Sequence, residues 1–529
     1  MLIGYISDER YLAISDAQVE FINANDESFE TRSRASGSVH IDLPSGKYDV
    51  IIAKAGFGSK RVSLDLPLQS VYHFRLLGER IIGYSWPKSI KFGDRSEFRI
   101  HSPEPYKLTL WRYGLTREFV RPIGWFDEHG PRATVQIAPD RDYTQTGIKW
   151  NTVGYTSPDH KQYIDAPAKS GLYYFHVKGE SGDFFSFPWV IAPSEPSSKI
   201  AVLCSDLNWN AYNNFGGRSN YIHPEGLPEK PTVYARSELL RYTQGTTASY
   251  VMTPHPLAQS LDRPELINFV PELTEVNDPI EGRAANHVAP AEWRLLAWLE
   301  KEGFSHDVYS ETQLHNDEFN LESYKVLILG PHPEYWTSKM YYKVKDWVHK
   351  TGGRLMYLGG NGINAEVELV DSTSMAVHNF PADYLSSKNL ESRFHARNES
   401  EANLLGVVYD KRGIMTAAPY KVSNADHWVF EGTGLRDNQL FGTESQHMRI
   451  PGGASGHETD KISPRFSPKN IELLAKGTNP DGGGAEMAIY ETPNGGSVFS
   501  AASICYVSSL LWDKGVSDIT SNVLKRFLR

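Results

Sequence analysis

The chain has 529 residues, 40% hydrophobic and 22% charged, a composition that is ordinary for a globular protein with room for about three domains. Its formal net charge of -10 argues against a nucleic-acid partner, and two cysteines are too few for a disulfide framework or a cysteine-rich metal site. No segment approaches the roughly 20 apolar residues of a membrane span, and the first residues lack a signal-peptide pattern, so we expect a cytoplasmic protein without a membrane partner.

Residues 1–80 show the pattern of a small β-sandwich. Apolar residues alternate with polar ones over residues 39–43 and again over 48–52, on either side of a Pro-Ser-Gly turn. The stretch SGSVHIDLPSGKYDVIIAKAGF (36–57) resembles the carboxypeptidase regulatory-like domain, which is an all-β accessory fold. This resemblance implies a role in packing or assembly.

Residues 81–195 are predicted to form a second β-sandwich domain. Short alternating segments are separated by loops that contain Pro and Gly, which is typical of a sandwich. The stretch SEPSSK (194–199) is the predicted linker into a third domain, which spans 196–529.

The third domain combines buried-type strands with amphipathic helices. Short apolar runs predict strands at 199–203, 307–309, 325–329 and 354–358. Helices are predicted from Pro290 to Gly303 and from Thr337, an N-cap, to the Gly-Gly pair at 352–353. Two more strands (487–491 and 496–500) and a helix that carries Ile519, Val523 and Phe527 complete the chain. The stretches 222–288 and 363–485 show little periodicity, so we expect two long insertions that set the pocket's dimensions.

The segment 325–362 is predicted to be a strand–helix–strand unit with parallel strands. Open sheets of this kind bind ligands at the carboxyl ends of their strands. His332 and Glu334 follow the first strand, and Asn361 follows the second. These three residues are therefore the first candidates for chemistry.

This strand–turn–helix–strand–turn plan resembles class I glutamine amidotransferase-like domains, which have a flavodoxin-like α/β fold. In that fold the second turn carries a nucleophilic cysteine, but the turn here is Gly359-Gly-Asn361-Gly. Asn361 cannot be a nucleophile, although its amide could donate hydrogen bonds to an oxyanion. Cys204 ends another strand and is expected to be buried, so cysteine acyl transfer is disfavoured.

Five motifs in chain order resemble the large (β) subunit family of N,N-dimethylformamidase over roughly residues 80–529. They are NWNAYNNFGGRSNY (208–221), GPHPEYW (330–336), GGRLMYLGGNG (352–362), GGASGHETD (452–460) and ETPNGGSVFS (491–500). The resemblance implies β-sandwich modules followed by an amidotransferase-like domain. It also implies hydrolysis of a small linear amide at a mononuclear iron held by two tyrosines and one carboxylate. Ferric iron is a hard ion that favours such anionic oxygen ligands.

The resemblance assigns the iron ligands residue by residue. Glu334 in HPEYW matches the carboxylate, and Tyr212 in NAYNNFGG matches the first tyrosine. Tyr250 in ASYVMTP is chosen as the second tyrosine, with Tyr221 and Tyr242 left open.

Three further residues are expected beside the iron. His332 matches a histidine that orients substrate or shuttles a proton, and Glu458 in SGHETD matches an acid–base group. Asn361 is the candidate oxyanion donor. His457 has no counterpart in the family pattern, and Ile363 stands where the family usually has an aromatic residue.

Other interpretations remain open for these residues. Glu334 could cap the helix that follows, and a single tyrosine more often packs with its hydroxyl on a partner than binds a metal. The alternatives are a metal-free hydrolase with Glu458 or Glu334 as general base, or a binding or scaffold protein on an amidotransferase-like fold without its cysteine. Beside a small amide substrate, we expect a homo-oligomer and a possible small second subunit.

Overall fold

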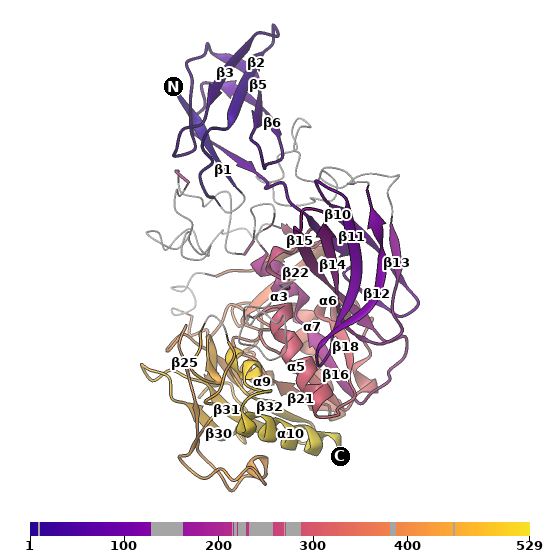
Figure 1. The fold of residues 1–529 in the computed structure, drawn as a ribbon. Helices are drawn as coiled ribbons and strands as arrows, with labels where there is room; N and C mark the ends of the chain where they lie inside the picture. Colours follow the sequence, from indigo (N-terminus) through magenta and orange to yellow (C-terminus); the bar gives the residue numbers. More distant parts are fainter. Residues whose placement is uncertain are drawn as a thin grey trace.

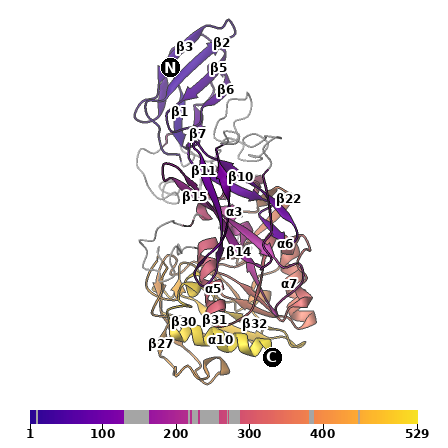
Figure 2. The same ribbon diagram turned by 45° about the vertical axis from the view of Figure 1, so that its right-hand side comes forward.

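The computed structural model describes residues 1–8, 11–127, 162–213, 215, 219–220, 229–231, 258–268, 270, 287–380, 388–447 and 450–529. A small β unit at the N-terminus projects from the rest of the molecule, and this arrangement is clear in both ribbon views (Figures 1 and 2). The chain ends at the opposite pole, beside the helix α10 (Figure 1). Among the described residues, none of the helices combines the length and apolar character needed to span a bilayer.

The N-terminal unit pairs a three-stranded sheet, β4-β1-β7, with a four-stranded sheet, β3-β2-β5-β6. Its strands are β1 (Leu2–Asp8), β2 (Gln18–Asn23), β3 (Ser28–Arg32), β4 (Ser38–His40), β5 (Gly46–Ala53), β6 (Lys60–Leu66) and β7 (Tyr72–Leu76). Along β5, Tyr48, Val50 and Ile52 are buried, which confirms the predicted alternation. They join one separate hydrophobic core together with residues of the other sheet, such as Ile6 and Phe74.

The second unit consists of the sheets β12-β11-β14-β15-β9 and β13-β10-β8. Its strands are β8 (Ile82–Trp86), β9 (Ser89–Lys91), β10 (Arg95–His101), β11 (Tyr106–Tyr113), β12 (Arg117–Phe126), β13 (Tyr163–Asp165), β14 (Gly171–Gly179) and β15 (Phe184–Ala192). The side chains of Leu108, Phe175 and Phe187 are among those that fill a second core. The unit is therefore all-β over its described residues, as predicted.

The third unit is built on a nine-stranded sheet of order β18-β16-β19-β21-β32-β31-β30-β26-β27. The strands are β16 (Ile200–Cys204), β18 (Asp307–Ser310), β19 (Val326–Leu329), β21 (Arg354–Tyr357), β26 (Tyr420–Val422), β27 (Leu440–Phe441), β30 (Glu472–Gly477), β31 (Glu486–Glu491) and β32 (Ser497–Ser500). The first five in sheet order pair in parallel, and the rest pair antiparallel. The parallel strands are buried almost along their whole length, as expected where both faces are covered, whereas β26, β27 and β30 at the antiparallel end carry exposed residues.

The predicted strand–helix–strand unit is confirmed. Between β19 and β21 runs α7 (Ser338–Thr351), whose N-cap Thr337 accepts a hydrogen bond from the Met340 amide. The helix ends at Gly352, whose φ of 82° favours a residue without Cβ. The helix faces the core with Met340, Val344 and Trp347, as its periodicity predicts.

The remaining elements surround this sheet. The helices are α3 (Asp206–Tyr212), α5 (Ala289–Lys301), α6 (Glu311–His315), α9 (Ala402–Leu405), α10 (Lys514–Leu528) and the 3-10 turns η3 (Leu266–Asn268), η4 (Leu321–Ser323), η5 (Trp428–Phe430) and η6 (Ile504–Ser508). The short strands are β17 (Ala258–Ser260), β20 (Tyr335–Trp336), β22 (Ala365–Asp371), β23 (Ser374–Val377), β24 (Val407–Asp410), β25 (Ala417–Ala418), β28 (Ser455–Gly456) and β29 (Thr459–Ile462). The helices α5 and α10 and the strands β31 and β32 match the predicted elements.

The stretch 363–485 is more regular than predicted. It contains β22 to β30, and three of these strands extend the main sheet beyond β31. Their segments of two to seven residues are too short for periodicity to reveal them.

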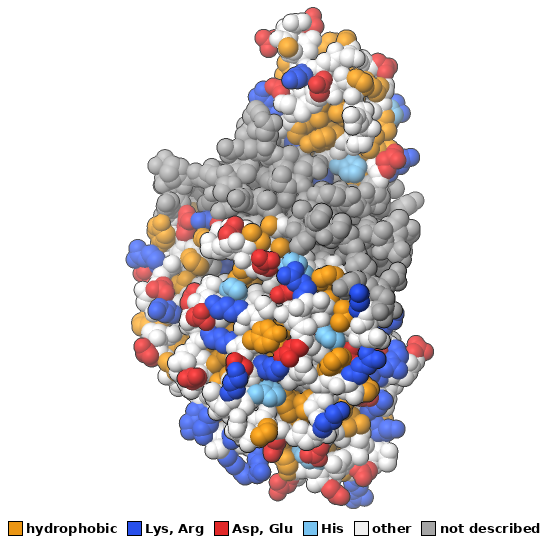
Figure 3. Space-filling view, turned by 180° about the vertical axis from the view of Figure 1, so that it is seen from behind, with side chains coloured by type: hydrophobic (Ala, Val, Ile, Leu, Met, Phe, Trp, Pro, Cys, Tyr) orange, Lys and Arg blue, Asp and Glu red, His pale blue; other side chains and the backbone are white. Residues whose placement is uncertain are grey.

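The helix α5 connects the second and third units. The Arg112 guanidinium lies 2.7 Å from Glu300, and the Trp293 indole donates to the Gly114 carbonyl at 2.5 Å. The chain is thus a β-rich protein of several units, and its assignment to the amidotransferase-like fold stays a prediction. On one face of the molecule, acidic and basic side chains are interspersed (Figure 3).

Candidate active site

Three turns and one helix bring the candidate residues together. The turns follow β19 and β21 and connect β28 to β29, and the helix α3 follows β16. Because β16, β19 and β21 are adjacent parallel strands, their carboxyl ends meet at one edge of the sheet. The turns and the helix together bring five of the six predicted residues into one cluster: Tyr212, His332, Glu334, Asn361 and Glu458. Tyr250, and with it Tyr221 and Tyr242, lies outside the described residues.

Glu334 lies at the centre of the cluster. Its side chain is about 2% exposed. Oε2 accepts a hydrogen bond from the Tyr212 hydroxyl at 2.9 Å, and Oε1 accepts one from Arg393 Nη2 at 2.7 Å. Burial raises the pKa of Glu334, and the nearby charges of His332 and Arg393 oppose that rise. The carboxylate therefore depends on these partners to carry a charge.

His332 joins the two acidic side chains of the cluster. Its Nε2 lies 3.3 Å from Glu334 Oε2 and 3.2 Å from Glu458 Oε2, although neither contact has the alignment of a good hydrogen bond. Its Nδ1 lies 3.0 Å from Nδ1 of His287. Burial alone would lower the pKa of His332, but the contact with Glu458 and the nearby carboxylates outweigh burial and raise it. The ring thus favours the protonated form.

Glu458 is the ionised partner of this histidine. Burial acts to raise the pKa of Glu458, but the interaction with His332 and the hydrogen bond from Asn361 prevail and lower it to about 2. The Asn361 amide donates to Oε2 at 2.8 Å. Glu458 and Glu334 therefore have opposite pKa shifts, which indicates different environments for the two carboxyl groups.

Asn361 is held in a strained backbone conformation. Its φ is 52°, and its backbone amide donates to Asp460 Oδ1 at 2.8 Å. The Tyr357 hydroxyl donates to Asp460 Oδ2 at 2.7 Å and accepts from the Gly362 amide at 2.7 Å. Burial raises the pKa of Asp460 to about 7. These bonds direct the Asn361 side chain to Glu458, and its role as an oxyanion donor stays a prediction.

Buried acids position the helix α3, which carries Tyr212. Glu292 Oε1 accepts hydrogen bonds from the Ser205 amide at 3.1 Å and from the Trp209 indole at 2.9 Å. Glu311 Oε2 accepts from the Leu207 amide at 3.2 Å. Carboxyl oxygens at this end of a helix satisfy amides that have no partner within the helix.

The buried cysteine beside these acids is confirmed as a core residue. Cys204 is 1% exposed, and burial raises the pKa of its thiol well above the usual value. A thiol of this kind is a poor nucleophile. This agrees with the expectation that cysteine acyl transfer is disfavoured.

Sequence reasoning missed several residues of the cluster. His287 and Arg393 fall in the two stretches without periodicity, so no local signal pointed to them. Asp460 belongs to the GGASGHETD motif, where its spacing from Glu458 could have identified it. His457 has a φ of 66°, and its Nδ1 lies 3.2 Å from Nε2 of His447.

The donor atoms of the cluster fit a hard metal ion. His332, Glu334 and Glu458 each offer one ligand atom, and these atoms lie within 4.8 Å of one another. The Tyr212 phenol adds another oxygen beside Glu334. His332 Nε2 is buried without a well-formed hydrogen bond, as expected of an atom suited to a further partner. Oxygen donors outnumber the one nitrogen here, and oxygen favours a hard ion over a soft one; the identity of the ion stays a prediction.

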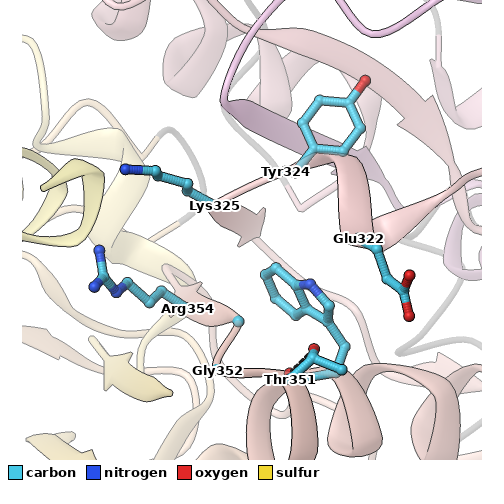
Figure 4. Close-up of a pocket in the computed structure, with 8 residues that line it drawn as sticks. Glu322, Tyr324, Lys325, Thr351, Gly352 and Arg354 are labelled. Carbon is cyan, nitrogen blue, oxygen red and sulfur yellow. Dashed lines mark hydrogen bonds between the residues drawn. The ribbon is translucent and has the colours of Figure 1, made fainter. Parts of the chain in front are cut away.

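A cavity of about 420 Å³ lies elsewhere, at the amino ends of β19 and β21 (Figure 4). Its cations are engaged with the end of α10, because Lys325 Nζ lies 3.1 Å from the Leu528 carbonyl and Arg354 contacts the Phe527 carbonyl. Ligands of open α/β sheets bind at the carboxyl ends of the strands. The cluster around Glu334 is therefore the stronger candidate.

Comparisons with known proteins agree with the motifs. A family model described as N,N-dimethylformamidase beta subunit-like, C-terminal, matches residues 111–518. The N,N-dimethylformamidase beta subunit of Paracoccus aminophilus is 27% identical over 420 residues, which cover 68% of this chain and 53% of that protein. The subunit of the same name from Alcaligenes sp. is 29% identical over 478 residues, or 74% of this chain and 59% of that protein.

The chain thus spans between 53% and 59% of the length of these curated relatives. Among solved structures, a DUF3823 family protein from Bacteroides ovatus matches with 11% identity and a TM-score of 0.12, covering 34% of this chain and 92% of that one. A similarity this low carries no argument about the fold. The family model, in contrast, covers most of the chain, and the chain belongs to the N,N-dimethylformamidase beta subunit-like family.

Proposed function

We propose that this chain is the catalytic part of an iron-dependent amidohydrolase that cleaves a small linear carboxamide, similar to a formamide, into a carboxylate and an amine. The observation that carries the proposal is the part-buried hydrogen bond of Tyr212 to Glu334, beside the pair of His332 and Glu458. Family membership and the names of the relatives support the choice of substrate class. We place the reaction in the cytoplasm.

Tyr212, Glu334 and a second tyrosine would hold the ion, with Tyr250 as our choice for the second. A ferric ion held there would supply Lewis acidity, which would polarise the amide carbonyl or lower the pKa of a water molecule. The oxygen donors of Tyr212 and Glu334 are already 2.9 Å apart, so they need little reorganisation to share one ion.

The remaining residues move protons. We assign Glu458 to accept a proton from the attacking water and His332 to donate one from Nε2 to the nitrogen of the departing amine, because the two side chains lie 3.2 Å apart beside Glu334. His287 fixes the ring of His332, because the contact between their Nδ1 atoms requires one donor and one acceptor. Water adds to the carbonyl carbon, the C–N bond breaks, and the amine leaves with the proton it has received.

Asn361 keeps Glu458 oriented through its amide and is our candidate donor to the carbonyl oxygen in the tetrahedral intermediate. Ile363, in the same turn, is buried and has a φ of 52°, which is unusual for a β-branched residue. We assign it to the wall that limits the size of the amide.

The assembly is part of the proposal. The relatives are named as beta subunits, which supports a second subunit as a partner, and we propose that it is small. We also propose that the chain associates with copies of itself. Size-exclusion chromatography with light scattering, on the chain alone and with a co-expressed candidate subunit, measures both.

The test uses the full chain and a series of formamides and acetamides, with release of amine as the assay. The protein is stripped with a chelator and then supplied with iron, zinc or magnesium. Activity should return with iron alone, and Glu334→Gln should remain inactive under all conditions. The exposed Glu322→Gln, outside the cluster, is the matched control and should behave as the wild type.

Two other functions give different results. A metal-free hydrolase with Glu458 as base would stay fully active after iron is removed. A binding or scaffold protein would keep all its functions in Glu334→Gln, and it would release no amine from any amide.

A further inference from the structure

We propose that Arg393 is the residue that positions Glu334: it occupies Oε1, so that Oε2 alone faces Tyr212 and His332. This inference rests on the proposed function, in which Glu334 is an iron ligand. If Arg393 occupies Oε1, Glu334 would bind the iron through Oε2 alone. No motif in the sequence contains Arg393, which lies in the stretch 363–485.

The contact between Arg393 and Glu334 is short and shielded from solvent. Nη2 of Arg393 lies 2.7 Å from Oε1 of Glu334, and the two side chains are 16% and 2% exposed. The other oxygen, Oε2, lies 2.9 Å from the Tyr212 hydroxyl and 3.3 Å from His332 Nε2. One oxygen of the carboxylate thus contacts the guanidinium, and the other contacts the rest of the cluster.

Hydrogen bonds on its far side fix the guanidinium in this position. Nη1 of Arg393 donates to Asn379 Oδ1 at 3.2 Å, and the amide of Asn379 donates to Asn220 Oδ1 at 2.5 Å. The amide of Asn220 in turn donates to the hydroxyl of Tyr335, the residue next to Glu334. This network joins the stretch 363–485 and the segment after α3 to the turn that carries the carboxylate.

The planar fork of an arginine suits this task better than a lysine would. Two nitrogens of one rigid group bind two partners, Glu334 and Asn379, and so define the rotation of the carboxylate as well as its charge. A lysine supplies the charge through a single mobile ammonium. If charge alone mattered, lysine would replace arginine without effect, whereas a positioning role requires the fork.

The two oxygens of the Glu334 carboxylate have separate partners. His332 Nε2 lies 3.3 Å from Oε2, whereas Arg393 Nη2 lies 2.7 Å from Oε1. Removing Arg393 therefore leaves the partners of Oε2 in place and takes the guanidinium away from Oε1. We expect the carboxylate to rotate in response and offer both oxygens to the same side.

The experiment compares Arg393→Met and Arg393→Lys with the wild type. Arg397→Met is the control, since Arg397 is four residues along and makes its contacts with Glu366, at 2.5 Å, and with His378, which both lie outside the cluster. Two measurements are made on each protein: the chelator concentration that removes half of the iron, and the visible spectrum of the loaded protein. Residues that orient metal ligands change metal affinity by about 10- to 100-fold when they are lost.

Arg393→Met should release iron at a chelator concentration lower by at least about 10-fold and should shift the visible band, because the donor set changes. Arg393→Lys should show the same shift of the band with a smaller loss of iron. Arg397→Met should match the wild type in both. Wild-type affinity and spectrum in Arg393→Met would overturn the proposal.

A crystal structure of iron-free Arg393→Met separates this proposal from the proposed function. We expect the Glu334 carboxylate to be rotated relative to the iron-free wild type, with Oε2 no longer 2.9 Å from the Tyr212 hydroxyl. An unchanged carboxylate refutes the positioning role. A wild-type protein that cannot bind iron refutes the proposed function, and the rotation still decides the role of Arg393.

Discussion

Glu292 gives a prediction about stability whose size can be worked from the structure. This carboxyl is 2% exposed and accepts hydrogen bonds from the Ser205 amide and the Trp209 indole at the start of α3. Burial raises its pKa from 4.5 to about 8. Since the folded state binds the proton more tightly than the unfolded state, the stabilisation is complete below about pH 4.5 and is lost as the pH rises through 8.

The expected slope follows from one proton. Within this window the folded chain holds up to one more proton than the unfolded chain, so the free energy of unfolding falls by up to about 1.4 kcal/mol per pH unit. Glu292→Gln keeps a carbonyl oxygen to accept both hydrogen bonds and cannot ionise. From about pH 5.5 to 7.5, the free energy of unfolding should therefore fall by roughly 2 kcal/mol more in the wild type than in Glu292→Gln.

The assay is urea unfolding followed by tryptophan fluorescence, with Trp209 beside the mutated group. Glu302→Gln is the control and should keep the wild-type slope, because Glu302 is exposed at the C-cap of α5, the helix that also carries Glu292. The neighbouring acids Asp206 and Glu311 and the Cys204 thiol remain in all three proteins, so only the difference between slopes is compared. Identical slopes in the wild type and Glu292→Gln would refute the reasoning that Glu292 is buried in its neutral form.

Three further predictions concern the turns of the cluster. Gly360→Ala places a Cβ 2.3 Å from the Glu458 carbonyl oxygen, so we expect a clear fall in melting temperature and activity, whereas Gly78→Ala, with nothing within 4 Å, should change neither. Tyr357→Phe removes the hydroxyl that bonds to Asp460 and to the Gly362 amide. At roughly 1 kcal/mol for each hydrogen bond, the free energy of unfolding in urea should fall by about 2 kcal/mol. An unchanged free energy of unfolding would mean that these two hydrogen bonds are not formed. The ionised Glu458 carboxylate stabilises the wild type above about pH 4.5, and this stabilisation is lost as the pH falls towards 2. The difference in free energy of unfolding between the wild type and Glu458→Gln should therefore shrink on acidification, by up to about 3 kcal/mol. A difference that stays constant with pH would contradict the lowered pKa of Glu458.

The elements that position the cluster could be predicted because their signals are local. The apolar runs of β19 and β21, the N-cap Thr337 and the glycine at the end of α7 are each evident within a few residues. A parallel pair of strands then places His332, Glu334 and Asn361 at one edge, which the structure confirms. The assignment of roles to these residues stays a prediction.

The rest of the cluster could not be read from local pattern. Arg393 comes from a stretch of short strands, and His287 from a stretch without hydrophobic periodicity, so only tertiary packing brings them to the cluster. The division of the Glu334 carboxylate between Arg393 and Tyr212 is likewise a property of the folded chain. The second tyrosine stays a choice, with Tyr250 outside the described residues.

The measurement that tests the central claim most directly is a visible absorption spectrum of the purified protein, with metal analysis of the same sample, for the wild type and Tyr212→Phe. Tyrosinate bound to ferric iron absorbs visible light, and a hard ion held by oxygen donors should be present at about one per chain. The account predicts a coloured wild-type protein that contains iron, and a variant whose band is bleached. A colourless protein that cannot be loaded with iron, or a band that Tyr212→Phe leaves unchanged, would contradict it.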